Sequence, residues 1–214
     1  MNNKGPVTIN YDIWDIVICY RTFIANSNLN SELKMGKIWG FLLFFLTSCI
    51  STNGLYTGYE KLTDEQKEYV VKCEGRISQQ HNDGRVYKIT IEQLKQYIAQ
   101  FPYVLVYDYK PNCTGNFCVN PAIVETFCQQ HSCQFCLVAC DLDGIFDIPK
   151  LSSPILFMDN EPYNTRIQQK YEKRFLEDLT GYTYKERGYG RYILFRNGQY
   201  IETYNSYTDA FKVP

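Results

Sequence analysis

Two short apolar runs with a helix start between them limit the folds open to this chain. Residues 103–107 read Tyr-Val-Leu-Val-Tyr, and residues 135–140 read Phe-Cys-Leu-Val-Ala-Cys. Near-continuous runs of this kind are typical of strands that are covered on both faces, as in parallel sheets. Between them, Asn120 and Pro121 supply a helix N-cap and the proline that favours the first helical position. The order strand, helix, strand therefore predicts a βαβ unit in an α/β sheet.

Flanking segments add further helices and strands to this unit. Two Thr-x-x-Gln capping boxes predict one helix from residue 64 to about Cys73 and another from residue 91 to Pro102. A short strand is expected between them, at 85–89. A charged amphipathic helix is expected at 166–179, before Gly181. The closing prediction is a hairpin, because Asn197-Gly198 lies between two strand-like runs.

The N-terminal part carries a pattern that does not belong to a globular domain. Residues 35–48 combine Lys37, nine apolar residues and a small-residue exit, as in a secretory signal peptide. The apolar run is shorter than the roughly 20 residues that cross a bilayer as a helix. Leu46-Thr47-Ser48-Cys49 also resembles the bacterial lipoprotein box, which implies a lipid anchor on Cys49. The alternative is a buried strand followed by a chance cysteine.

The segments around this signal follow from it. Residues 49–60 are expected to be a short polar tether. Because a signal sequence works at an N-terminus, we expect Met35 to be the start and residues 1–34 to be an upstream extension. A second small structured segment around Ile13–Ile24 is the alternative.

Charge and histidine content exclude two classes of function. The chain has 22 basic and 23 acidic side chains, a net charge of -1, so no nucleic-acid partner is expected. With only two histidines, histidine-rich metal chemistry is not expected either. Asp141 and Asp143 end the second predicted strand, where sites often form in α/β folds, but a solvated turn is the favoured interpretation.

Nine cysteines are the unusual feature of the composition. Cys113 and Cys118 flank a loop that contains Gly115, so their Cα atoms could approach as closely as a disulfide requires. A compartment outside the reducing cytosol favours that bond. A structural disulfide is the main interpretation; a redox-active pair and two free thiols remain open.

The cysteines of the second strand are interpreted differently. If Cys133 is extended, its Cα lies about 10 Å from that of Cys136, too far for a disulfide. Cys128, Cys133, Cys136 and Cys140 are therefore expected to be small buried hydrophobes. A zinc site from Cys128, His131, Cys133 and Cys136 is the alternative. We expect no metal or cofactor there, because a helix end and a buried strand point these side chains apart.

The predicted elements, ending in Ile193-Leu194-Phe195-Arg196-Asn197-Gly198-Gln199, resemble a thioredoxin-like domain. The likeness covers roughly residues 103–211, and the chain also resembles small thioredoxin-like lipoproteins of Bacteroidetes. The fold class it implies is α/β, with a thioredoxin-like central sheet flanked by helices over residues 102–214. Residues 61–101 would be a small helical lead-in. The activity it implies is thiol–disulfide exchange through Cys113, with Cys118 as the resolving thiol.

Two departures from the family weaken that activity. Thioredoxins place two residues between the cysteines, at a helix N-terminus, whereas four separate Cys113 from Cys118 here. The family's cis-proline position, counted back from Asn197-Gly198, is occupied by Gly190. We therefore expect a non-catalytic binding or structural module, with an oxidoreductase as the alternative. Its expected place is the bacterial cell envelope, lipid-anchored in the outer membrane and facing the periplasm, with a possible protein partner.

Overall fold

The computed structural model describes residues 56–113 and 118–212. The expected upstream segment (1–34), the signal peptide (35–48) and the lipidation residue Cys49 lie outside the described residues. Within the described ranges, no helix combines the length and the apolar character needed to cross a membrane.

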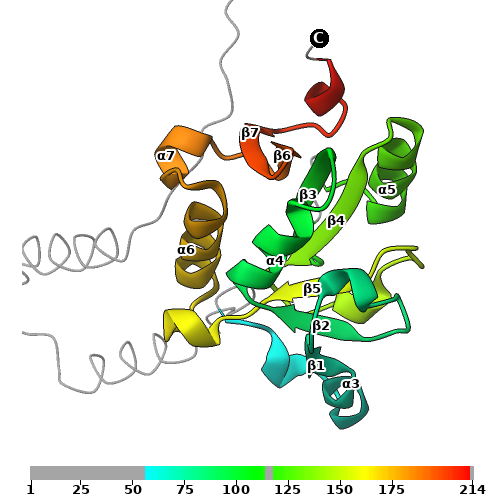
Figure 1. The fold of residues 1–214 in the computed structure, drawn as a ribbon. Coiled ribbons are helices and arrows are strands. Elements are labelled where there is room, and N and C mark those ends of the chain that lie inside the picture. Colours follow the sequence, from blue (N-terminus) through cyan, green and yellow to red (C-terminus); the bar gives the residue numbers. More distant parts are fainter. Residues whose placement is uncertain (1–55, 114–117, 213–214) are drawn as a thin grey trace, which may run out of the picture. The chain divides into compact units, whose positions relative to one another are not determined.

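The described residues form a mixed sheet of seven strands in the order β1-β2-β5-β4-β3-β6-β7 (Figure 1). The neighbouring pairs from β1 to β3 in this order are parallel, β6 is antiparallel to β3, and β7 is antiparallel to β6. The α/β class expected from the sequence is confirmed. The strands are β1 (Val70–Lys72), β2 (Val86–Ile89), β3 (Tyr103–Tyr109), β4 (Gln134–Ala139), β5 (Ile155–Met158), β6 (Tyr192–Arg196) and β7 (Gln199–Tyr204).

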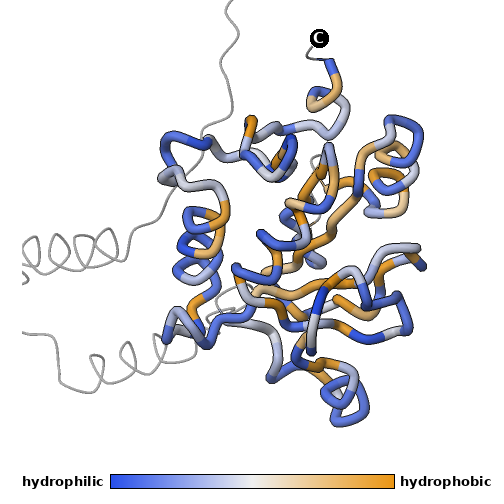
Figure 2. Tube along the Cα trace, in the orientation of Figure 1, coloured by the Kyte–Doolittle hydropathy of each residue, from blue (hydrophilic) through white to orange (hydrophobic). Residues whose placement is uncertain are grey.

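Helices cover both faces of the sheet. The longer ones are α4 (Ile91–Ile98), α5 (Pro121–Gln130) and α6 (Gln168–Thr180). The short ones are α3 (Asp64–Glu68), α7 (Tyr184–Arg187) and the 3₁₀ turns η1 (Tyr59–Lys61), η2 (Ile77–Gln79), η3 (Ile145–Asp147), η4 (Glu161–Tyr163) and η5 (Asp209–Phe211). Hydrophobic residues predominate along the inner strands, whereas hydrophilic and hydrophobic residues alternate along the helices (Figure 2).

Strand β3 shows how the two cores are divided. Its side chains alternate between the faces of the sheet. Val104 and Val106 are fully buried in a cluster with residues of α4 and α6, whereas Leu105 and Tyr107 are buried with residues of α5. The next residue on the α6 side is Asp108, which is where the apolar pattern of the strand breaks.

Local sequence signals act as expected at several element ends. Thr90 accepts a hydrogen bond from the Gln93 amide (3.4 Å), and the Gln93 side chain accepts one from the Thr90 amide (3.0 Å), so the capping box opens α4. Asn120 accepts a hydrogen bond from the Ala122 amide at 2.9 Å and caps α5. Asn197 and Gly198 have φ values of 49° and 79°, as a type I′ hairpin turn requires.

Two expectations for the lead-in need correction. The helix predicted to reach Cys73 ends at Glu68, and Val70–Lys72 forms β1 instead. The β-branched pair Val70-Val71 joins the parallel ladder beside β2, so pairing overrides the local helix signal. The expected helical lead-in therefore contributes two strands to the sheet. The described end of the expected tether is also packed, since Thr57 is buried and its carbonyl accepts a hydrogen bond from the Leu142 amide at 2.9 Å.

Candidate functional site

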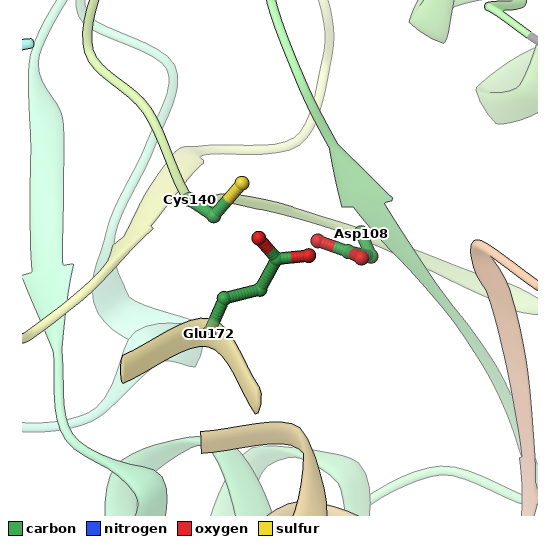
Figure 3. Close-up of side chains that lie close together, drawn as sticks. All are labelled: Asp108, Cys140 and Glu172. Atoms are coloured by element: carbon green, nitrogen blue, oxygen red, sulfur yellow. The ribbon is translucent and has the colours of Figure 1, made fainter. Parts of the chain in front are cut away.

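Three buried side chains meet where the parallel strands β3 and β4 end. Asp108 comes from β3, Cys140 follows the last residue of β4, and Glu172 comes from α6. One ligand atom of each side chain lies within 4.8 Å of the other two (Figure 3). The exposed fractions of Asp108 and Glu172 are only 4% and 5%, and that of Cys140 is zero. We call Asp108, Cys140 and Glu172 the buried triad.

The members of the buried triad differ in how their polar atoms are satisfied. The Cys140 thiol accepts a hydrogen bond from Gln168 Nε2 at 2.9 Å, and the Cys140 carbonyl accepts one from the Tyr171 hydroxyl. Glu172 Oε1 lies 2.8 Å from the ammonium of Lys110. Asp108 Oδ1 is buried and has no hydrogen-bond partner. Such an atom is rare in a native interior and needs an explanation.

Burial dominates the electrostatics of the buried triad. It raises the pKa of Asp108 to about 7; the Glu172 carboxylate adds to the rise, and the cations of Lys110, Arg191 and Arg187 oppose it. Burial also raises the pKa of the Cys140 thiol well above its ordinary value. At neutral pH, Cys140 is therefore a neutral thiol and Asp108 is partly protonated. A buried acid with so perturbed a pKa beside a pocket is a typical property of functional sites.

A pocket of about 300 Å³ borders the buried triad at Glu172 and the disulfide at Cys113. Glu172 and Lys110 form part of its wall, together with Cys113, Asp141, Asn112 and Arg191. The pocket lies at the carboxyl ends of parallel strands, where ligands usually bind in open α/β sheets. Asp141 also lines this pocket. The sequence favoured a solvated turn at this residue, but only 5% of Asp141 is exposed.

Cys113 and Cys118 form the disulfide expected from the sequence, with their Cα atoms 5.6 Å apart. Cys118 is followed by Val119 and by Asn120, the N-cap of α5. The disulfide therefore precedes the helix N-terminus rather than forming part of it, which leaves both sulfurs without the direct influence of the helix dipole.

The remaining described cysteines are free and buried, as expected for Cys128, Cys133, Cys136 and Cys140; Cys73 is the fifth. His131, in the alternative zinc set, is exposed and its ring stacks on Phe127. Throughout residues 56–113 and 118–212, only the buried triad brings three or more potential ligand side chains together. The set of Cys128, His131, Cys133 and Cys136 is therefore not assembled.

Gly190 occupies the position where the resemblance implies a cis-proline. It is buried, and a Cβ added to it would overlap the backbone carbonyl of Tyr204. None of the described peptide bonds is cis. A proline therefore does not fit at this position, because the backbone of β7 fills the space that its ring would need.

A second pocket, of about 410 Å³, lies over the ends of β1, β2 and β5. Its charged side chains pair with one another, since Glu161 lies 2.9 Å from both Lys72 and Lys88. We therefore regard the pocket that borders the buried triad as the better candidate site.

The sequence did not single out Asp108 or Glu172. Asp108 directly follows the apolar run, and Glu172 shares a helical face with Phe175 and Leu179, so an acid on an apolar face was the available signal. No protein-family model, curated protein or solved structure matches the chain. The candidate site therefore rests on its geometry alone.

Proposed function

We propose that this chain is a lipid-anchored envelope protein whose divergent thioredoxin-like domain binds a partner without catalysing thiol–disulfide exchange. The neighbouring strands β4-β3-β6-β7 support the resemblance. In this group of strands, the parallel pair β3 and β4, connected through α5, is extended by the antiparallel hairpin of β6 and β7. The proposed binding surface is the pocket between Cys113 and the buried triad, at the carboxyl ends of β3 and β4.

The packing of Gly190 is the observation that favours binding over exchange. In thioredoxins the cis-proline faces the reactive thiol. Here that position holds a glycine pressed against the Tyr204 carbonyl, so β7 occupies the corresponding space. The place of the disulfide, ahead of α5, points the same way, because a thiol away from a helix N-terminus lacks one source of activation.

The Cys113–Cys118 bond should behave as a structural disulfide. Closing a loop of about six residues stabilises a fold by roughly 2 kcal/mol on chain-entropy grounds. Cys113→Ser should therefore lower the free energy of unfolding by about 2 kcal/mol in urea titrations. A redox titration against glutathione should give a potential below about -300 mV. Cys136→Ser is a control for the redox titration, since it removes a free buried thiol and leaves the bond intact.

Thiol–disulfide exchange is the second candidate, because Cys113 lines the pocket beside Lys110 and Glu172. In that mechanism the Cys113 thiolate attacks a partner disulfide, one partner sulfur leaves as a thiolate, and Cys118 then displaces the other. A Cys118→Ser variant cannot complete the second step and would accumulate mixed disulfides. Such adducts, absent when Cys113 is also replaced, would overturn the structural assignment in favour of the oxidoreductase.

We further propose that Cys49 carries the lipid and holds the protein in the outer membrane, facing the periplasm. Lys37, the apolar run 38–46 and Thr47-Ser48-Cys49 support this. Cys49→Ala should abolish incorporation of labelled palmitate, whereas Cys73→Ala, which changes a buried thiol of the domain, should retain it. Lipid labelling that survives Cys49→Ala, or a native protein whose mass includes residues 1–34, would contradict the anchor or the start at Met35.

A further inference from the structure

We propose that Asp108, Cys140 and Glu172 bind one divalent transition-metal ion, with zinc as the best fit. The buried triad offers one sulfur and two carboxylate oxygens, all within 4.8 Å of one another (Figure 3). Zinc is a borderline-soft ion that accepts both ligand types. This assignment goes beyond the proposed function and depends neither on the thioredoxin resemblance nor on the disulfide.

The fold directs the three ligands to one point from three different elements. Asp108 is held by β3, Cys140 by the end of β4, and Glu172 by α6, whose apolar face packs on the same side of the sheet. A tetrahedral zinc ion with Zn–S of about 2.3 Å and Zn–O of about 2.0 Å needs sulfur–oxygen separations of about 3.5 Å. The ligand atoms, which lie within 4.8 Å of one another, would have to approach by about 1 Å to reach that geometry.

The orphaned oxygen of Asp108 is an independent indication of a missing ligand. Asp108 Oδ1 has no hydrogen-bond partner, and the residue is only 4% exposed. The carboxylate is turned toward Glu172, into the space that the buried triad surrounds (Figure 3). A buried acceptor without a donor destabilises the fold. A metal ion in this space would bind the Asp108 carboxylate and supply the missing partner.

The neighbouring charges determine how tightly an ion can bind. On binding, Cys140 gives its thiol proton to solvent and becomes a thiolate, and Asp108 releases the proton that it partly retains, as metal ligation requires. The two carboxylates and the thiolate then carry three negative charges. The ammonium of Lys110, 2.8 Å from Glu172 Oε1, and the guanidinium groups of Arg187 and Arg191 around Asp108 oppose this charge. We therefore expect weaker binding than at a four-cysteine structural site.

The pocket adjoins the proposed metal position on one side. Glu172 belongs to the buried triad and also lines the pocket, together with its ion-pair partner Lys110. A fourth ligand would reach the ion from this side. Three protein ligands with a fourth position open to water or a small ligand are typical of zinc sites that bind or activate molecules, whereas structural zinc sites are closed by four protein ligands.

Cobalt titration of the full-length chain tests the metal site. The protein, stripped with a chelator and kept without reductant, is titrated with Co²⁺ and then with Zn²⁺. We expect one ion per chain, a thiolate-to-cobalt charge-transfer absorption, and its loss when zinc displaces cobalt. Cys140→Ala should abolish the absorption. Asp108→Asn and Glu172→Gln should each weaken binding at least about tenfold, since even indirect supports of metal ligands contribute that much.

Cys136→Ala provides the matched control, because Cys136 is equally buried and packs in the same core as Cys140. It should keep the absorption and the affinity. The site is refuted if the wild-type chain gives no thiolate band at one equivalent, or if the band survives Cys140→Ala. If near-ultraviolet circular dichroism shows that Cys140→Ala does not fold, the cobalt affinity of Asp108→Asn tests the site instead, because this substitution preserves the shape of the side chain. Unchanged affinity in that variant overturns the proposal.

Discussion

Replacing Gly190 with alanine should lower the free energy of unfolding by about 3 kcal/mol, a large part of the stability of a domain of this size. The added Cβ would overlap the carbonyl group of Tyr204. This group belongs to the backbone of β7, so it cannot move aside as the flexible end of a side chain could. The clash can be relieved only by moving backbone, either that around Gly190 or that of β7. Urea unfolding followed by circular dichroism measures the loss.

Gly181→Ala serves as the control for this prediction. Gly181 ends α6 in the left-handed region, with a φ of 77°, but a Cβ there meets no atom within 4 Å. The free energy of unfolding of Gly181→Ala should fall by about 1 kcal/mol, the cost of the left-handed backbone conformation alone. Equal losses in the two variants would show that Gly190 is not confined by β7. The argument against a substrate-facing cis-proline position would then fail.

Elements whose signals are local in the sequence were predicted well. The two turn residues Asn197 and Gly198 determine the last hairpin, because few other dipeptides adopt two successive left-handed conformations without strain. The N-caps Thr90 and Asn120 likewise fix the starts of α4 and α5. The buried runs that became β3 and β4 were recognisable since a strand covered on both faces has no polar alternation.

Strand β1 shows where local reasoning failed. The capping box at Thr63 does open a helix, but α3 ends at Glu68 and Val70–Lys72 pairs with β2. The extended conformation gains ladder hydrogen bonds only when β2 is already in place, so the β-branched pair Val70-Val71 is not by itself enough to predict the strand. Whether such a segment forms a strand depends on its tertiary contacts.

The candidate site was predicted only in its disulfide. Cys113 and Cys118 are close in sequence, so loop geometry sufficed to pair them. Asp108, Cys140 and Glu172 come from separate elements and meet only after β3, β4 and α6 have packed. The sequence showed Cys140 as a small buried hydrophobe, and its burial is confirmed. Asp108 and Glu172 were recognisable only as acids on apolar faces, and their proximity to Cys140 could not be predicted without the strand order.

The metal-free protein should lose stability as pH rises from about 4 to 7, because of Asp108. The folded state raises the pKa of this carboxyl from 3.8 to about 7, so the folded chain keeps a proton that the unfolded chain releases above pH 4. Stability is therefore highest below the unfolded pKa and falls until the folded pKa is passed. At about 1.4 kcal/mol per pKa unit the upper bound is about 4 kcal/mol. Because relaxation of the buried site lowers the effective penalty for the charged form of Asp108, we expect about 2 kcal/mol.

Asp108→Asn isolates this contribution, because the amide has the same shape and does not titrate. In the presence of a chelator, urea unfolding between pH 4 and 8 should show the decline in the wild-type chain and a flatter profile in the variant. At pH 8 the variant should be the more stable by about 2 kcal/mol. Asp64→Asn, at a fully exposed carboxylate paired with Lys67, should retain the wild-type decline. If the wild-type profile is flat, or if Asp108→Asn declines as steeply, another group or a bound donor must satisfy the buried carboxylate, and the orphaned Oδ1 would lose its significance as a sign of a missing ligand.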